Sequence, residues 1–288
     1  MIYMSSIQFP SDDAESGFIY FDVKMKSTAY NTHYPFRTLA INGLQRIEFD
    51  PITILYGGNG SGKSTALNVI AEKIKAKRKS VFNKTNFYPD YLKMCTVDMR
   101  AITPAEIRII TSDDVFDYML NIRNLNEGID ERREEIFEEY LDAKYSKFQM
   151  RSMADYEQLK KVVKSRSKTQ SAYTRSEIMG NIRELSNGES AFMYFTEKIG
   201  ENSLYILDEP ENSLSPKRQM ELAGFLQDSV RFYGCQIIMS THSPFLLSMQ
   251  AAKVYNLDEN PAAVRKWTEL ENVRAYYDFF ELHKNEFA

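Results

Sequence analysis

The sequence has few of the features that mark several specialised classes of protein. Its 288 residues contain only two cysteines, so a disulfide framework is excluded. No apolar run reaches about 18 residues, and the mean hydropathy is −0.44, so no membrane-spanning helix is expected. Met1–Ser16 has no basic segment followed by an apolar one, so we expect no secretory signal. Cys95 and Cys235 lie in apolar strand-like runs, which favours a reducing cytoplasm.

The net charge of the chain is small and its glycine content is low. The formal net charge is −4, so nucleic-acid binding would require a local basic patch. The chain has 12 glycines, roughly 4% of its residues, where about 7% is usual. Four of them are Gly57, Gly58, Gly60 and Gly62. A third of the glycine therefore lies within six residues, which indicates that another group approaches the backbone closely there.

The remaining sequence is typical of a globular α/β protein. Hydrophobic residues make up 43% and charged residues 26% of the chain, which excludes disorder and low complexity. Alternating or apolar runs predict strands at 18–25, 45–49, 52–56, 94–99, 107–110, 203–207, 235–239 and 253–257. Helical patterns cover 63–75 and 216–231. Strands that alternate with helices predict a mainly parallel sheet.

Long, charged helical patterns interrupt this arrangement between residues 112 and 182. We therefore expect a core formed by 1–111 and 183–288, with 112–182 as a helical insertion. Both charge runs of the insertion, 127–142 and 160–175, are most simply solvated helix faces.

The glycine cluster forms a known phosphate-binding pattern. Gly57-Gly-Asn-Gly-Ser-Gly-Lys-Ser64 fits G-x-x-x-x-G-K-[ST], the P-loop. Backbone N–H groups of such a loop surround the phosphates, Lys63 would reach the β and γ phosphates, and the Ser64 hydroxyl would bind Mg²⁺. A predicted strand precedes the motif and a predicted helix follows it, as the mechanism requires. A flexible glycine turn is the alternative interpretation.

Two further strands end in polar residues that suit nucleotide hydrolysis. The strand at 203–207 runs into Asp208 and Glu209. Asp208 is the candidate for Mg²⁺, and Glu209 is the candidate for orienting and deprotonating the attacking water. The strand at 235–239 leads to His242, whose position matches a sensor of the γ-phosphate. A solvated turn and a satisfied core histidine are the structural alternatives.

Leu185-Ser-Asn-Gly-Glu-Ser190, between the P-loop and Asp208, resembles the signature motif of ABC-type ATPases. The order of P-loop, signature, acidic pair and histidine is that of the superfamily. With Tyr34-Pro-Phe36 and the run Asp208–Gln219, the chain is most similar to small standalone prokaryotic ATPases of the SMC/RecF-like branch. The similarity covers about 34–75 and 180–286 and implies an ABC-type P-loop NTPase domain with an N-terminal antiparallel β part.

The resemblance also implies a set of functional residues and partners. Two chains would bury two Mg-ATP molecules head to tail, each signature meeting the γ-phosphate on the other chain's P-loop. Lys63, Glu209 and His242 would be catalytic, and Ser64 and Asp208 would hold the metal. The remaining nucleotide ligands would be Gly58, Asn59, Gly60, Ser61, Gly62, Thr65, Ser186, Asn187, Gly188 and Glu189.

Three positions depart from the common pattern of the superfamily. Asn187 and Glu189 differ from the usual signature, and Ser215 stands where transporters usually have aspartate. The lid glutamine has no clear counterpart, the nearest candidates being Ser112 and Asp113.

Several functions are compatible with these residues. The leading hypothesis is a soluble ABC-type ATPase whose dimerisation and opening act on a partner protein or nucleic acid. Transporter ATPase subunits and small-molecule kinases are the alternatives. Nucleic acid would contact the basic residues Lys160, Lys161, Lys164, Arg166, Lys168 and Arg175. We expect the apolar residues of 271–287, namely Val273, Tyr276, Tyr277, Phe280 and Leu282, to dock on the sheet, with a partner-binding surface as the alternative.

Overall fold

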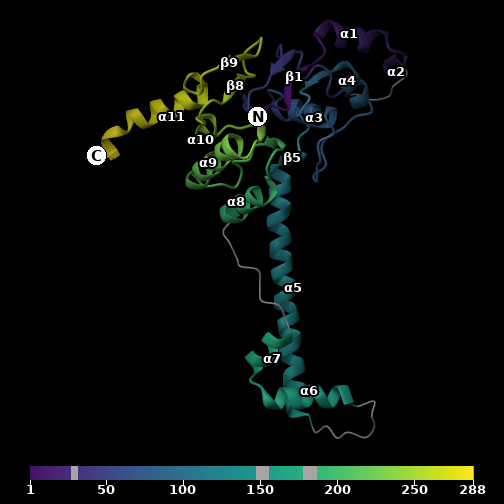
Figure 1. The fold of residues 1–288 in the computed structure, drawn as a ribbon, viewed down its shortest axis with the longest axis vertical. Coiled ribbons are helices and arrows are strands. Elements are labelled where there is room, and N and C mark those ends of the chain that lie inside the picture. The colour runs from purple at the N-terminus through teal and green to yellow at the C-terminus, as the bar shows by residue number, and fades with distance from the viewer. Residues whose placement is uncertain (27–31, 147–155, 178–186, 288) are drawn as a thin grey trace. The chain divides into compact units, whose positions relative to one another are not determined.

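The computed structural model describes residues 1–26, 32–146, 156–177 and 187–287 (Figure 1). The chain divides into two compact units. The first combines Met1–Phe116 with Asn187–Ala288, and the second comprises Asp117–Ser186.

A six-stranded sheet forms the centre of the first unit. Its strands, in spatial order, are β5 (Ile107–Thr111), β6 (Leu204–Asp208), β7 (Gln236–Ser240), β3 (Ile52–Tyr56), β8 (Lys253–Asn256) and β9 (Ala263–Arg265). Neighbouring strands pair in parallel except β8 and β9, which are antiparallel. The prediction of a mainly parallel sheet is therefore confirmed.

The middle of this sheet is covered on its faces by helices. All five residues of β3 and of β7 are buried, as expected for apolar runs in a parallel sheet. Helix α3 (Lys63–Lys73) packs on β6 and β7, and α9 (Pro216–Phe232) packs on β7 and on α8 (Asn187–Lys198). Helix α9 starts where the Ser215 hydroxyl accepts the Arg218 N–H, with Pro216 at the first helical position.

A small antiparallel sheet lies in the amino-terminal part of the first unit. It has the order β2 (Arg46–Glu48), β1 (Met4–Gln8) and β4 (Thr96–Met99), and α4 (Tyr88–Met94) precedes β4. The expected antiparallel β part is confirmed, but the strand predicted at 18–25 is wrong.

Residues 18–25 instead belong to α1 (Asp12–Phe21) and α2 (Val23–Lys26). The Ser11 hydroxyl caps α1 by accepting the Ala14 N–H, and three acidic residues in the first turn suit the helix dipole. The ring of Phe18 stacks on that of Phe36 at 4.9 Å, so an apolar residue of the predicted strand contributes to helix packing.

The carboxyl-terminal part of the first unit contains α10 (Pro244–Leu247), two short 3-10 helices at Trp267–Glu269 and Lys284–Phe287, and α11 (Glu271–Leu282). Of the apolar residues of α11 that were predicted to dock on the sheet, only Val273 is buried, and for the other four the prediction is wrong. Tyr276, Tyr277, Phe280 and Leu282 are between 53% and 79% exposed. Asn272 anchors the start of α11 by donating to the His242 carbonyl oxygen at 3.0 Å, and the rest of the helix lacks such cover among the described residues.

The second unit is helical. It contains most of α5 (Ser112–Tyr145), α6 (Tyr156–Ser167) and α7 (Gln170–Glu177). Ile136, Tyr140 and Tyr173 form a small buried cluster, and the Tyr140 hydroxyl donates to the Lys168 carbonyl oxygen at 3.1 Å. Although α5 is long, no helix in the described part of the chain has the length and apolar character needed to cross a membrane.

A buried glutamine connects the two sheets of the first unit. Gln236, the first residue of β7, is fully buried. Its Oε1 accepts the N–H groups of Tyr3 and Met4 at 2.7 and 2.9 Å, and its Nε2 donates to the Met4 carbonyl oxygen at 2.8 Å. Without these bonds, backbone polar groups of β1 would be buried and unpaired.

Replacing Gln236 with leucine tests this connection. Gln236→Leu nearly keeps the side-chain volume but removes these three hydrogen bonds and a fourth, from Nε2 to the Asp50 carbonyl oxygen at 3.4 Å, so we expect the free energy of unfolding to fall by roughly 2–4 kcal/mol. Urea denaturation with an unchanged slope would measure it, and Gln250→Leu at an exposed position is the control. Equal stability of Gln236→Leu and the wild type would contradict the assignment.

Candidate active site

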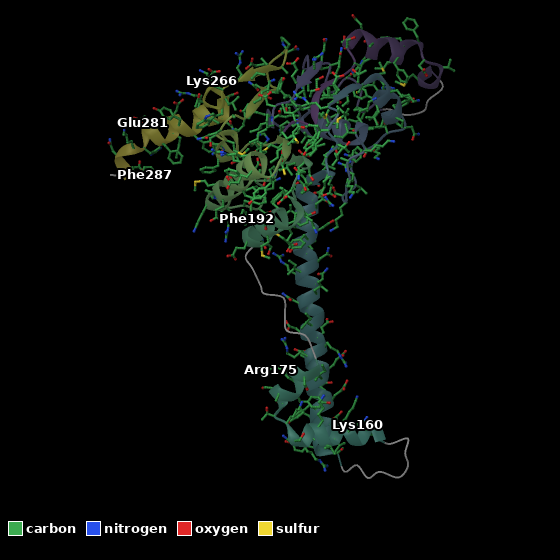
Figure 2. The ribbon with its side chains drawn as sticks, viewed as in Figure 1. Lys160, Arg175, Phe192, Lys266, Glu281 and Phe287 are labelled. Carbon is green, nitrogen blue, oxygen red and sulfur yellow. The ribbon has the colours of Figure 1, made fainter. Side chains whose placement is uncertain are left out.

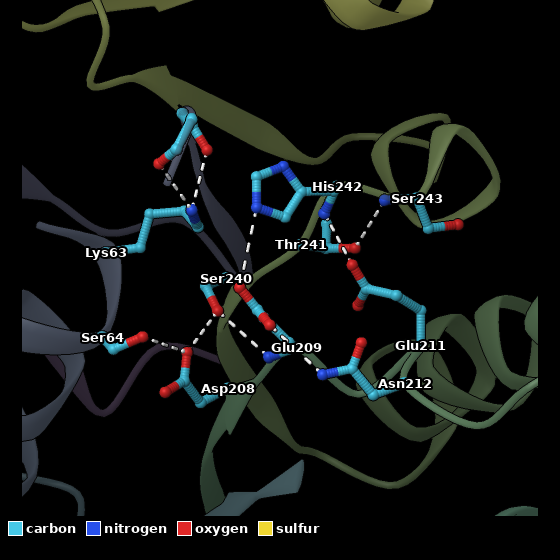
Figure 3. Close-up of polar contacts among 12 residues, drawn as sticks. Lys63, Ser64, Asp208, Glu209, Glu211, Asn212, Ser240, Thr241, His242 and Ser243 are labelled. Carbon is cyan, nitrogen blue, oxygen red and sulfur yellow. Dashed lines mark hydrogen bonds and ion pairs between the residues drawn. The ribbon is translucent and has the colours of Figure 1, made fainter. Parts of the chain in front are cut away.

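Strand register brings the predicted site residues to one edge of the sheet. Asp208 is paired with Ser240 across β6 and β7, and Leu55 is paired with Ser240 across β3 and β7. These strands are parallel, so their carboxyl ends meet at one edge, where a ligand of an open α/β sheet usually binds. The P-loop leaves β3 at this edge, and the loop to His242 leaves β7 beside it (Figure 3).

The P-loop adopts the backbone conformation that its glycines allow. Gly60 and Gly62 have φ of 85° and 94°, in the left-handed region that favours glycine. A Cβ on Gly62 would lie 2.9 Å from Leu39 Cδ2, so the loop also packs too closely for a side chain there. Helix α3 begins directly afterwards at Lys63. Its free N–H groups and dipole suit a phosphate at this position.

The side chain of Lys63, at the end of the P-loop, folds back into the loop. Its side chain is buried, and its Nζ donates to the carbonyl oxygens of Gly57 and Gly58 at 2.7 and 3.1 Å. Burial lowers the pKa of Lys63, whereas the carboxylates of Glu209 and Asp208 counteract part of this by raising it. The lysine is thus placed where it can contact a bound phosphate without moving far from the loop.

Asp208 and Ser64 form the part of the site that fits a metal ion. The Ser64 hydroxyl donates to Asp208 Oδ1 at 3.1 Å, and the Ser240 hydroxyl donates to the same oxygen at 2.6 Å. Burial raises the pKa of Asp208, and these two hydrogen bonds lower it. A carboxylate and a hydroxyl are oxygen ligands of the kind that Mg²⁺ prefers.

The metal ligands would not all come from the protein. In the described ranges, no group of three or more histidine, cysteine, aspartate or glutamate side chains could hold a metal ion. Mg²⁺ at Ser64 and Asp208 would therefore take its other ligands from phosphate oxygens and water, as is usual for this ion. When bound there, the ion would neutralise phosphate charge.

Glu209 has an unusual backbone conformation for a residue with a side chain. Its φ of 49° lies in the left-handed region, which costs roughly 1–2 kcal/mol. The Glu209 N–H donates to the Ser240 hydroxyl at 3.1 Å, and Oε2 accepts from the Asn212 amide at 3.2 Å. Glu209 Oε1 lies 3.6 Å from His242 Nε2, so the two predicted catalytic side chains face each other.

Glu211, which the sequence did not single out, holds His242 in place. Its Oε1 accepts the backbone N–H of His242 at 2.6 Å, and burial raises its pKa. Burial also lowers the pKa of His242, with a smaller contribution in the same direction from Lys63. The only signal in the sequence was the third acid of Asp208-Glu-Pro-Glu211, and the backbone N–H that it binds lies 31 residues away.

The signature residues that the structure describes, from Asn187 onward, belong to the first unit and lie on α8. Ser186 is outside the described residues. Asn187, Gly188 and Glu189 form the first turn of α8, and a Cβ on Gly188 would lie 3.4 Å from the Ser213 carbonyl oxygen. Glu189 pairs with Arg218 Nη2 at 3.1 Å, and Arg218 also lies over the ring of Phe192, which Figure 2 labels on α8. These contacts hold the first turn of α8, which carries the signature residues, against α9.

The two lid candidates lie at the start of α5. Ser112 and Asp113 follow Thr111, which is paired with Asp208 across β5 and β6. Asp113 is exposed. The buried carboxylate here is instead Asp114, which accepts the N–H groups of Thr111 and Ser80 at 2.8 and 2.9 Å. A metal ligand from this segment stays unassigned.

Two other P-loop contacts were also missed at the sequence level. The Asn42 amide donates to the Ser61 carbonyl oxygen at 2.7 Å, and the Tyr34 hydroxyl donates to Thr65 Oγ1 at 3.2 Å. Asn42 and Tyr34 lie 19 and 31 residues before the residues that they contact, so no local pattern predicts these contacts.

A comparison with known families identifies the class of this site. The family model described as ABC transporter matches residues 45–212, which is more than half of the chain. The chain therefore belongs to this family, and with its P-loop, acidic pair and histidine it is an ABC-type ATPase, an ATP hydrolase. A second model, described as an AAA domain from a Type IV TA system, matches residues 181–248. No curated protein matches the sequence.

Solved structures that match this chain include SMC heads and an ATP-binding cassette. The SMC head domain from Thermotoga maritima is 12% identical and has a TM-score of 0.41, with 92% of this chain and 99% of that chain covered. The Smc head from Pyrococcus furiosus bound to the C-terminal domain of ScpA is 14% identical, with coverages of 83% and 95% and a TM-score of 0.35. A dimeric ATP-binding cassette bound to ADP and Pi is 12% identical, with coverages of 77% and 88% and a TM-score of 0.36.

Removing the Glu211 carboxylate tests whether it positions the histidine. We expect Glu211→Ala to lower the kcat of ATP hydrolysis about tenfold or more, because small displacements of catalytic groups are costly. Glu211→Gln, which keeps an acceptor oxygen, should retain most activity. Steady-state kinetics with the exposed Glu201→Ala as control would measure this, and wild-type kcat in Glu211→Ala would refute the role.

Proposed function

We propose that the protein binds Mg-ATP between two copies arranged head to tail. Hydrolysis then changes the conformation of the pair and acts on a partner protein or nucleic acid. The observation that carries this proposal is the gathering of Lys63, Ser64, Asp208, Glu209 and His242 at one edge of the sheet. These groups supply phosphate binding, metal binding and water activation in one place.

The position of the signature supports the dimer. Asn187 and Gly188 lie in the first turn of α8, where the helix dipole favours an anion. The atoms nearest to a Cβ on Gly188 belong to Ser213, Ser215 and Arg218, at the start of α9 and in the loop before it. A second copy could bring such a turn to the γ-phosphate. In this arrangement, Lys63 binds the β and γ phosphates and Glu209 orients the attacking water, with His242 beside it.

We also propose that the ATPase acts in the cytoplasm, where cysteines stay reduced. Cys95 and Cys235 are both free and buried, which suits a reducing compartment. The alternative, an ATPase subunit of a membrane transporter, is less favoured, because Asn187 and Glu189 depart from the common signature and the helical unit is charged.

A glutamine substitution tests hydrolysis and dimerisation together. Glu209→Gln keeps the shape of the side chain but cannot accept a proton, so we expect kcat to fall about 100-fold or more while ATP still binds. Light scattering coupled to size exclusion should show twice the monomer mass in Mg-ATP. The exposed Glu201→Gln is the matched control. Normal turnover by Glu209→Gln, together with monomeric mass in ATP, would disprove the mechanism.

Nucleic acid is the second partner to test, because the second unit contains a basic depression. Arg132, Lys160, Lys161 and Lys164 line a cavity of about 340 Å³, together with Tyr173, Ile136 and Glu139. Lys161 pairs with Glu139 at 3.3 Å, so part of this charge is already balanced. Figure 2 labels Lys160 on α6 and Arg175 on α7, both exposed.

Salt dependence distinguishes phosphate contacts from other binding. If the basic residues of the second unit bind DNA, affinity should fall by roughly tenfold or more between about 50 and about 200 mM salt, because each contact releases counterions. Fluorescence anisotropy with a labelled duplex would measure it, and Lys160→Ala with Lys161→Ala should reduce the slope. An affinity that does not change with salt would exclude this partner.

A further inference from the structure

An acidic residue far from every motif contacts the P-loop directly. Asp258 follows β8, and both of its carboxylate oxygens accept the N–H of Gly58, at 2.8 and 2.9 Å. Sheet register places it there. Tyr56 is paired with Asn256 across β3 and β8, and the Leu257 N–H donates to the Tyr56 carbonyl oxygen at 2.8 Å. Two residues beyond each strand end, Asp258 therefore lies beside Gly58.

This contact fixes one particular peptide group of the loop. The Gly58 N–H and the Gly57 carbonyl belong to the same peptide bond. Asp258 accepts from the N–H end, while Lys63 Nζ donates to the carbonyl end at 2.7 Å. Both bonds involve a charged group, so they are stronger than neutral ones and polarise the peptide in the same direction. Rotating the peptide would break both bonds and turn its carbonyl oxygen toward the carboxylate.

There is too little space for a side chain at Gly57, the first glycine of the loop, which lies between Ser61 and Asp258. A Cβ on Gly57 would lie 2.6 Å from Ser61 Oγ and 3.1 Å from Asp258 Oδ1. The carboxylate also acts on the charged groups of the site, because it contributes to raising the pKa of both Lys63 and His242 against the larger effect of burial. Asp258 thus affects the loop through both geometry and charge.

We propose that Asp258 is a positioning residue for the nucleotide, which holds the Gly57–Gly58 peptide in the orientation that keeps Lys63 in place for the phosphates. It acts through the loop and does not itself touch the phosphates. The inference rests on the part of the proposed function in which the P-loop binds ATP, and it does not depend on the dimer.

Equilibrium binding of Mg-ATP to the full chain tests this role. We expect Asp258→Ala to weaken the Kd about tenfold, since it removes a charge-assisted hydrogen bond. Asp258→Asn keeps one acceptor oxygen and should weaken the Kd about threefold. The neighbouring Glu259→Gln is the matched control, because Glu259 pairs with Arg265 and Asn256.

Steady-state kinetics separates positioning from loss of folded protein. The P-loop binds the phosphates in both the ground state and the transition state. Its loss of affinity in Asp258→Ala should therefore raise KM for ATP about tenfold while kcat stays within about threefold. A merely structural role would lower kcat through the folded fraction and leave the Kd of the folded molecules unchanged.

The outcomes are distinguishable. If wild type fails to bind Mg-ATP, the proposed function fails. If wild type binds and Asp258→Ala has the same or a tighter Kd, the positioning role alone is overturned. Should Asp258→Ala not fold, Asp258→Asn decides, because a Kd equal to or tighter than that of wild type would also overturn it.

Discussion

The parallel pairing of β6, β7 and β3 is the constraint on which the rest of the site depends. Asp208 and Leu55 are both paired with Ser240, so the ends of three strands coincide at one edge. The Ser240 hydroxyl donates to Asp208 and accepts from the Glu209 N–H. These two hydrogen bonds fix the positions of Asp208 and Glu209 relative to β7. Shifting one strand by a single residue would send its side chains to the opposite face and separate these groups.

Burial at this edge of the sheet disfavours the charged forms of the side chains that ATP hydrolysis requires. It lowers the pKa of Lys63 and raises that of Asp208, so each ion is disfavoured alone. Their proximity compensates, because each carboxylate near Lys63 raises its pKa. The left-handed backbone at Glu209 is a further local cost at the same edge. Local strain and desolvation of this kind are common where a fold is organised around a ligand.

Much of the architecture could be predicted, because its signals are local in the sequence. The apolar run at Ile52–Tyr56 and the glycines after it define β3 and the P-loop without any distant information. The run from Phe18 to Met25 was misleading, because the capping residue Ser11 that starts the helix lies outside it. The apolar stripe of α11 predicts a buried helix face but does not indicate which surface buries it. Among its residues, the described part of the chain buries only Val273. Asp258 and Glu211 act across 200 and 31 residues, so only strand register reveals them. The nucleotide contacts of the signature residues stay a prediction.

In the proposed dimer, two copies complete each site by placing a signature turn on the other's P-loop. The most direct measurement is a crystal structure of Glu209→Gln with Mg-ATP. We expect the N–H groups of Asn187 and Gly188 from a second copy to contact the γ-phosphate, with Mg²⁺ on Ser64 and Asp208. ATP held by the P-loop of one chain, with the signature turns of both copies away from it, would rule out the proposed dimer.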